Sequence, residues 1–189
     1  MDIQNRKIYV VLSNTGALTA KILKRITKAK YNHVSLSLKD DLSEMYSFGR
    51  RWKYWAFFGG FMKESLRWGL FSRFPKTQVA VFPFEVSQTQ YHAICSSIEK
   101  MYADRKRYKY NWWGLFLVLF HKKANRKRHY FCSEFVKKVL VDFGIEKEEN
   151  FPYVTTPNDF LALYGGGKTY EGELRAYAPP DLLSEQQAV

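Results

Sequence analysis

Two kinds of hydrophobic period open the chain. Residues 7–13 (KIYVVLS) are rich in β-branched and aromatic side chains and lead into Ser-Asn-Thr-Gly, so they predict a buried strand and a turn. Residues 18–30 carry apolar side chains at helical spacing, with lysines and one arginine on the other face, and predict a helix. Residues 32–38 alternate between apolar and polar side chains, which predicts a strand with His33 at the head of its polar face. Residues 44–48 follow a turn and predict the second strand of a hairpin.

The later part of the chain is mainly helical in pattern. Residues 78–84 predict one more strand, in which Pro83 is tolerated only near the end or on an edge. Apolar stripes at helical spacing predict helices over residues 87–103, 111–121 and 131–143, and Gly144 ends the last of these. A short final helix is expected after Thr155 and Thr156, because threonine is a good N-cap and Pro157 suits the first turn.

Residues 50–76 show neither period. The segment is crowded with Trp and Phe and is basic, with Glu64 as its only acid. We interpret it as an insertion or lid within a single domain, because 189 residues are typical of one domain. A flexible C-terminal tail is expected from about residue 178.

Composition and charge narrow the class of protein. Hydrophobic residues make up 46% and charged residues 25%, which is sufficient for a folded core. The net charge of +12 indicates anionic partners or simply good solubility. The N-terminal apolar run is shorter than that of a signal peptide, and residues 112–120 are too few to span a bilayer, so a cytoplasmic protein is expected.

The two cysteines differ in position. Cys95 lies in the middle of a helix on its apolar stripe, where a thiol behaves as a small hydrophobe. Cys132 lies in the first turn of a helix, where unpaired N–H groups and the helix dipole stabilise a thiolate. Neither belongs to a CxxC pair, so the sequence predicts no disulfide framework, no metal site and a reducing compartment.

A nucleophilic cysteine needs a base within hydrogen-bond reach and a group that orients the base. His33 is the preferred base, because it lies on a polar strand face that otherwise carries serines. His129 is nearer to Cys132 in sequence but belongs to a basic run, and His92 and His121 have no obvious partner. Periodicity alone leaves His33 open between a catalytic and a structural role.

Three motifs in order carry a family resemblance. YNHVSLSL, YFCSEFVKKVL and TPNDFLAL resemble the YiiX- and YebB-like group of circularly permuted NlpC-type papain-fold proteins, over residues 7–163. In this group the histidine strand precedes the cysteine helix, as it does here. The resemblance implies an α+β, papain-like fold in which an antiparallel sheet packs against the Cys132 helix. It also implies a cysteine amidase or peptidase that needs no cofactor.

The resemblance assigns roles residue by residue. It makes Cys132 the nucleophile and His33 the base, and aligns Ser47 with the third polar residue, which is usually His, Glu or Gln in this family. Serine can hold an imidazole N–H but supplies no charge, so Glu44 on the same strand is an alternative. The oxyanion is expected at the Cys132 backbone N–H, with Tyr130 as a candidate second donor.

Three substrates stay open: an intracellular amide, a wall-peptide fragment and a lipid-derived acyl group. The lecithin retinol acyltransferase branch of the permuted fold transfers acyl chains, and the aromatic, basic segments 50–76 and 112–120 suit an anionic membrane surface or cover the core. A different class stays open as well. The basic runs 106–109 and 122–128 would suit an inactive module that binds nucleic acid or membrane, although no recognised nucleic-acid motif is present.

Overall fold

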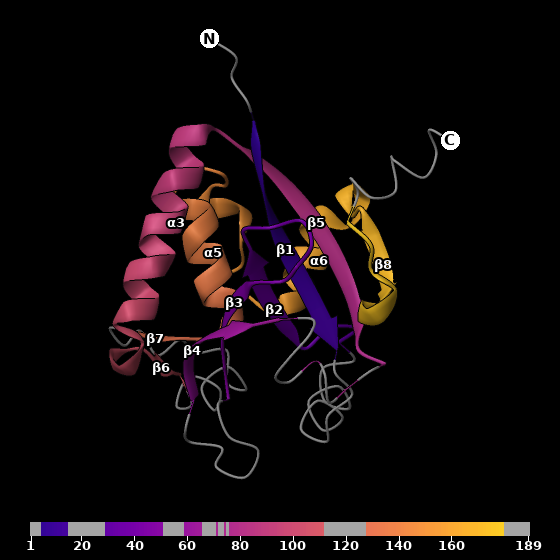
Figure 1. The fold of residues 1–189 in the computed structure, drawn as a ribbon, viewed down its shortest axis with the longest axis horizontal. Helices are drawn as coiled ribbons and strands as arrows, with labels where there is room; N and C mark the ends of the chain where they lie inside the picture. The colour runs from indigo at the N-terminus through magenta and orange to yellow at the C-terminus, as the bar shows by residue number, and fades with distance from the viewer. Residues whose placement is uncertain are drawn as a thin grey trace.

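The centre of the protein is a mostly antiparallel sheet (Figure 1). The computed structural model describes residues 5–14, 29–50, 59–65, 71, 74, 76–111 and 128–179. Within these residues eight strands are hydrogen-bonded in the order β7-β6-β4-β3-β2-β1-β5-β8, and β6 and β7 are the parallel pair. The strands are β1 (Arg6–Asn14), β2 (His33–Ser37), β3 (Met45–Arg50), β4 (Gly59–Glu64), β5 (Gln78–Val86), β6 (Lys109–Tyr110), β7 (His129–Tyr130) and β8 (Tyr170–Glu173).

Helices flank this sheet. The described α-helices are α3 (Gln88–Ala103), α5 (Cys132–Asp142) and α6 (Pro157–Tyr164), and the short 3-10 turns are η1 (Arg105–Arg107), η2 (Glu148–Asn150), η3 (Gly165–Gly167) and η4 (Leu174–Ala176). The α+β class expected from the sequence is therefore confirmed at this level. None of the helices described is long and apolar enough to cross a membrane.

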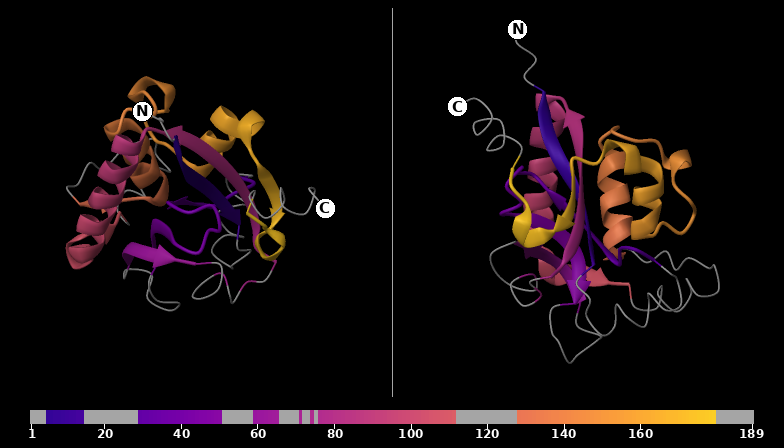
Figure 2. Two further views of the ribbon diagram at one scale, coloured as in Figure 1. Left: turned by 45° about the horizontal axis from the view of Figure 1, so that its top comes forward. Right: turned by 90° about the vertical axis from the view of Figure 1, so that its right-hand side faces the viewer.

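Strand β1 is buried on both faces. Its alternate side chains Ile8, Val10 and Leu12 join the larger core cluster, which includes residues of α3, α5 and α6. Tyr9 and Val11 join a smaller cluster on the opposite face. The right-hand view of Figure 2 shows α5 and α6 together on one side of the sheet. Burial on both faces explains why β1 reads as a continuous apolar run rather than as an alternation.

Helix α5 forms where its apolar period predicts. Phe135, Val136 and Leu140 are all buried against the sheet in the larger core. At its start the Glu134 carboxylate accepts a 2.9 Å hydrogen bond from the Phe131 N–H. At its end Gly144 adopts a φ of +66°, a left-handed conformation that favours glycine, so the expected C-cap is confirmed.

The other helix starts also follow local sequence signals. Ser87 caps α3, and its hydroxyl accepts from the Gln90 N–H while the Gln90 side chain accepts from the Ser87 N–H. Thr156 caps α6, where the Asp159 carboxylate accepts from both the N–H and the hydroxyl of Thr156. Such reciprocal bonds satisfy N–H groups that a helix start leaves unpaired.

Four strands, β4, β6, β7 and β8, were not expected from the sequence. The segment at 50–76, interpreted as an insertion or lid, contains β4, which pairs with β3 along its whole length from Gly59 to Glu64. Paired glycines and the lack of alternation hid this strand, because glycine weakens strand propensity and only the neighbouring strands supply the ladder. The polar edge strand β8 pairs with β5 over Gln78 to Val81, so Pro83 lies beyond the paired part of that edge.

The remaining expectations fall elsewhere in the chain. Several predicted features lie wholly or mostly outside the described residues. They are the helix at 18–30 up to residue 28, most of the helix at 111–121, much of segment 50–76 and the tail beyond residue 179.

Candidate functional site

The start of α5 and the start of β2 lie at the same end of the sheet. Strand β4 pairs with β6 at Gly60 and Lys109, and β6 pairs with β7, which leads into α5. On its other side β4 pairs Gly60 with Gly49 of β3. A methyl group at Gly49 would lie 3.8 Å from Cε1 of His33. This connectivity brings Cys132, the first residue of α5, to the end of the sheet at which His33 begins β2.

His33 and Glu64 form a polar pair that joins β2 and β4. His33 Nε2 lies 3.2 Å from both carboxylate oxygens of Glu64. Ser35, on the same strand as His33, donates a 2.7 Å hydrogen bond to Glu64 Oε2. The side chains of His33 and Glu64 are only 15% and 4% exposed. A buried carboxylate that is held by a second donor fixes the orientation of the imidazole ring.

The charges of His33 and Glu64 stabilise each other against burial. Burial lowers the pKa of His33, but the Glu64 charge and hydrogen bonds to Cys132 and Glu64 outweigh it, so the pKa stands well above 6.5. Burial raises the pKa of Glu64, but the charge of His33 and hydrogen bonds from His33 and Ser35 bring the net pKa below 4.5. Each group therefore favours the charged form of the other.

Cys132 lies beside the His33 ring. Its interaction with the imidazole contributes to the raised pKa of His33. Cys132 is only 6% exposed. Cys132 is the first residue of α5, so the backbone N–H groups that a helix start leaves unpaired lie close to its side chain.

Ser47 does not take the place that the sequence gives it. Its side chain is buried on β3, between the strands of His33 and Glu64. It is near enough to Glu64 to help lower the pKa of that carboxyl. Among the described residues, however, Ser47 Oγ has no partner that meets ordinary hydrogen-bond geometry. The alternative, Glu44, forms a 2.9 Å ion pair with Lys63.

Glu64 is the site residue that sequence reasoning missed. It ends β4, where it aligns with Met45 of β3, and Met45 aligns with Ser37 of β2. The only signal in the sequence is that Glu64 is the single acid of a basic, aromatic segment. The sequence does not show that Glu64 faces His33, because this contact depends on the pairing of β4 with β3.

Tyr130 ends β7, two residues before Cys132 begins α5, as expected. Its ring packs against Phe48 with centroids 5.3 Å apart. Burial raises the pKa of Tyr130, and the charge of Lys138 and the Tyr108 phenol also act on it. Its role as a second oxyanion donor at Cys132 stays a prediction.

The other candidates of the sequence lie elsewhere. Burial raises the pKa of Cys95 on α3, which disfavours its thiolate. His92 contacts Gln88 at 2.8 Å on the same helix. His129 pairs with Lys109 in the parallel ladder of β6 and β7, and His121 lies outside the described part of the chain.

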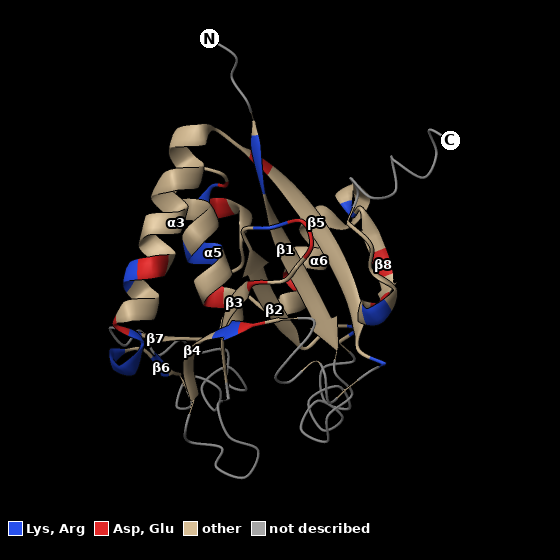
Figure 3. Ribbon diagram, viewed as in Figure 1, with Lys and Arg blue, Asp and Glu red and all other residues tan. Residues whose placement is uncertain are grey.

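A basic cluster lies beside the strand that leads into α5 (Figure 3). The Lys109 N–H donates a 2.9 Å hydrogen bond to the Arg128 carbonyl, which brings η1 and β6 close to the start of β7. Asp104 forms an ion pair with Arg107, with 3.4 Å between Oδ2 and Nη1. The exposed basic side chains of the cluster are Arg105, Lys106, Arg107, Lys109 and Arg128.

In the described ranges, no group of three or more His, Cys, Asp or Glu side chains is arranged to hold a metal ion. Comparison of the chain with protein families, with curated proteins and with solved structures finds no match. The site is therefore interpreted from its own geometry.

Proposed function

We propose that the protein is a cysteine hydrolase that cleaves an amide bond, with Cys132 as nucleophile and His33 as general base. One observation supports this most directly. His33 Nε2 lies 3.2 Å from both oxygens of the buried Glu64 carboxylate, and Cys132 is near enough to the imidazole to help raise its pKa. A nucleophile, a base and a group that orients the base are the three components that thiol acyl transfer requires.

The first half-reaction forms an acyl-enzyme. His33 holds the proton of the Cys132 thiol, and the thiolate attacks the carbonyl carbon of the amide. The negative oxygen of the tetrahedral intermediate is stabilised by the Cys132 N–H at the start of α5, where the helix dipole favours negative charge. The C–N bond then breaks, and His33 delivers its proton to the leaving amine. A thioester on Cys132 remains.

The second half-reaction restores the enzyme. His33 takes a proton from water, the resulting hydroxide attacks the thioester carbonyl, and the C–S bond breaks to release a carboxylic acid. The proton returns to the pair formed by His33 and Cys132. Throughout the cycle Glu64 keeps the imidazole in one orientation and stabilises its positive charge, which a serine cannot do.

We also propose a papain-like, circularly permuted architecture for this chain. The support is the order of the elements: the strand with the base, β2, precedes the helix with the nucleophile, α5, and α5 packs on the central strands of an antiparallel sheet. The expectation of a cytoplasmic location belongs to this proposal, as does the preference for peptide amides over lipid acyl groups.

The first test measures how alkylation of each cysteine depends on pH. Iodoacetamide is small enough for a thiol that is 6% exposed, and mass spectrometry separates the Cys132 and Cys95 peptides. We expect Cys132 to react faster than Cys95, with a half-maximal rate below pH about 8.5. His33→Ala should slow Cys132 by roughly 10-fold to 100-fold at pH 7, because the imidazolium that favours the thiolate is lost.

His92→Ala is the matched control, because His92 lies on α3 and contacts Gln88. It should leave both rates unchanged. Labelling of Cys132 that equals that of Cys95 and is insensitive to His33→Ala would overturn the proposal and favour a binding role for the basic cluster. If the dyad reacts as expected, a set of peptide amides and acyl esters, with Cys132→Ala as the blank, identifies the bond that is cleaved.

A further inference from the structure

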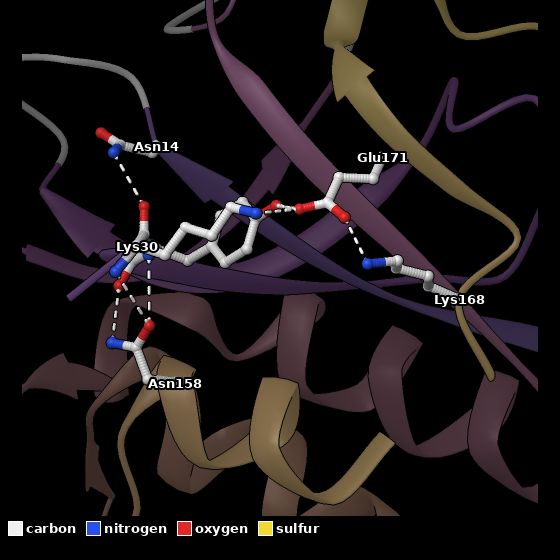
Figure 4. Close-up of polar contacts among 6 residues, drawn as sticks. Asn14, Lys30, Asn158, Lys168 and Glu171 are labelled. Carbon is white, nitrogen blue, oxygen red and sulfur yellow. Dashed lines mark hydrogen bonds and ion pairs between the residues drawn. The ribbon is translucent and has the colours of Figure 1, made fainter. Parts of the chain in front are cut away.

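The segment just before His33 is held by residues from the far end of the chain (Figure 4). Asn158, the second residue of α6, uses both ends of its side-chain amide on this backbone. Its Oδ1 accepts from the N–H groups of Lys30 and Tyr31, at 3.1 and 3.3 Å, and its Nδ2 donates to the Tyr31 carbonyl at 3.1 Å. These bonds join residues more than 120 positions apart in sequence.

The same α6 segment is tied to the nucleophile helix. Ser133, the neighbour of Cys132, is buried, and its hydroxyl donates a 2.7 Å hydrogen bond to the Thr155 carbonyl. The next residue, Thr156, is fixed as the N-cap of α6 by the Asp159 carboxylate. A continuous polar path therefore runs from the residue after Cys132, through the start of α6, to the backbone two residues before His33.

His33 needs such support because its strand is paired unevenly. On the β1 side, His33 is opposite Ser13 and the ladder continues through Ser37. On the β3 side, the pairs in the described structure are those of Leu36 and Ser37. The base therefore lies at the end of β2 that has a ladder on one side. The backbone before it is held by Asn158 at Lys30 and Tyr31, and by Asn14, whose Nδ2 donates a 2.9 Å hydrogen bond to the Lys30 carbonyl (Figure 4).

A second group holds the side chains of this segment. The Glu171 carboxylate of β8 accepts a 2.8 Å hydrogen bond from the Tyr31 hydroxyl and pairs with Lys30 and Lys168. A contact that holds only a side chain restrains the backbone less than a hydrogen bond to the backbone itself. The position of the main chain at Tyr31 is thus set by Asn158 rather than by Glu171.

We propose that Asn158 is a positioning residue, which sets the distance between the His33 ring and the Cys132 thiol by gripping the backbone of Lys30 and Tyr31. This inference rests on the proposed function. Displacement of a reacting group by about 1 Å can slow a reaction about 100-fold. The amide of Asn158 acts through the backbone and contacts neither reacting atom.

The test follows alkylation of Cys132 in Asn158→Ala and Asn158→Asp. We expect Asn158→Ala to slow Cys132 labelling about 10-fold or more at pH 7 and to move its pH profile toward that of His33→Ala, without a change at Cys95. Asn158→Asp keeps the acceptor for both N–H groups and suits a helix start, but loses the donor to Tyr31. Its rate should fall between those of wild type and Asn158→Ala while its thermal unfolding stays close to wild type.

Two controls separate positioning from general loss of stability. Asn150→Ala removes another asparagine amide, one that bonds to Glu146 at 2.8 Å, and should leave Cys132 labelling unchanged. Glu171→Gln weakens the grip on the side chains of Lys30 and Tyr31 and should change the rate less than about 3-fold.

The two possible failures give different results. If Cys132 labelling depends on His33 but both Asn158 variants react like wild type, the positioning inference is wrong and the proposed function stands. If Cys132 is labelled at the same rate in wild type and in His33→Ala, the proposed function fails and the inference fails with it. Should Asn158→Ala not fold, Asn158→Asp alone decides, because a wild-type rate and pH profile in that variant would overturn the inference.

Discussion

Glu64 carries a negative charge where burial disfavours one. Its side chain is 4% exposed at the end of β4, and its pKa is nevertheless lowered, because His33 and Ser35 both bond to the carboxylate. The same contact raises the pKa of His33. The two residues therefore determine each other's ionisation, and neither charge would be stable at this place alone.

The charge of Glu64 gives the first prediction. Glu64→Gln keeps a hydrogen-bond acceptor of similar size but removes the charge, so the pKa of His33 should fall and Cys132 alkylation at pH 7 should slow by at least about 10-fold. Ser47→Ala should stay within about 3-fold of wild type, because Ser47 Oγ has no hydrogen-bond partner within the part of the chain that the structure describes. The pH profile of alkylation in both variants is the measurement.

The comparison decides which residue acts as orienter. A large effect of Ser47→Ala together with a small effect of Glu64→Gln would restore the assignment that the sequence alone favours. Ser35→Ala serves as a further probe, since it removes the 2.7 Å bond to Glu64 while leaving the charge in place.

A helix or strand of this fold could be predicted locally where it has an apolar face or a capping residue at one end. The apolar stripe and Gly144 specify α5, and the alternation after Asn32 specifies β2. Strand β4 has no such local signal, since it begins with Gly59 and Gly60. Its conformation depends on pairing with β3 on one side and with β6 on the other.

Close packing at Gly59 gives the second prediction. A Cβ at this position would lie 2.7 Å from Tyr110 Cβ and 2.9 Å from the Gly49 carbonyl oxygen, so Gly59→Ala must push β4 away from its neighbours. We expect a loss of about 1 to 3 kcal/mol in the free energy of unfolding, measured by urea denaturation.

Gly166→Ala is the matched control, because nothing lies within 4 Å of its added Cβ. It should change the free energy of unfolding by less than about 0.5 kcal/mol. Equal stabilities of the two variants would contradict the close pairing of β4 with β3 and β6. Slower alkylation of Cys132 in Gly59→Ala would further show that β4 positions Glu64 at the site.

At the scale of the whole molecule, the buried ion pair links folding to pH. Because the pKa of His33 is raised on folding, its contribution to stability is complete below about pH 6.5 and is lost as the pH rises through the native pKa. Because the pKa of Glu64 is lowered, its contribution is present above about pH 4.5 and is lost as the pH falls through the native pKa. The pair therefore stabilises the fold most between these values.

The third prediction is a loss of stability on the alkaline side. In a Cys132→Ser background, which removes the thiol titration, the free energy of unfolding attributable to His33 should fall as the pH rises from about 6.5 through the native pKa of His33. Adding His33→Gln should flatten this part of the profile. Parallel profiles with and without His33 would show that the two groups titrate as they do in the unfolded chain.

The sequence by itself determined the elements whose partners are close in the chain, together with two residues of the site. Cys132 was placed by a helix start and His33 by the polar face of a strand, and both are signals that a few neighbouring residues carry. The tertiary structure alone decided the acid that faces His33 and the amide that holds the segment before it. Glu64 and Asn158 lie 31 and about 127 residues away from their partners, and no local period encodes such a contact. The reason is physical: a buried charge or a backbone hydrogen bond is satisfied by whatever donor the folded chain brings within about 3 Å, and strand pairing and helix packing bring it there.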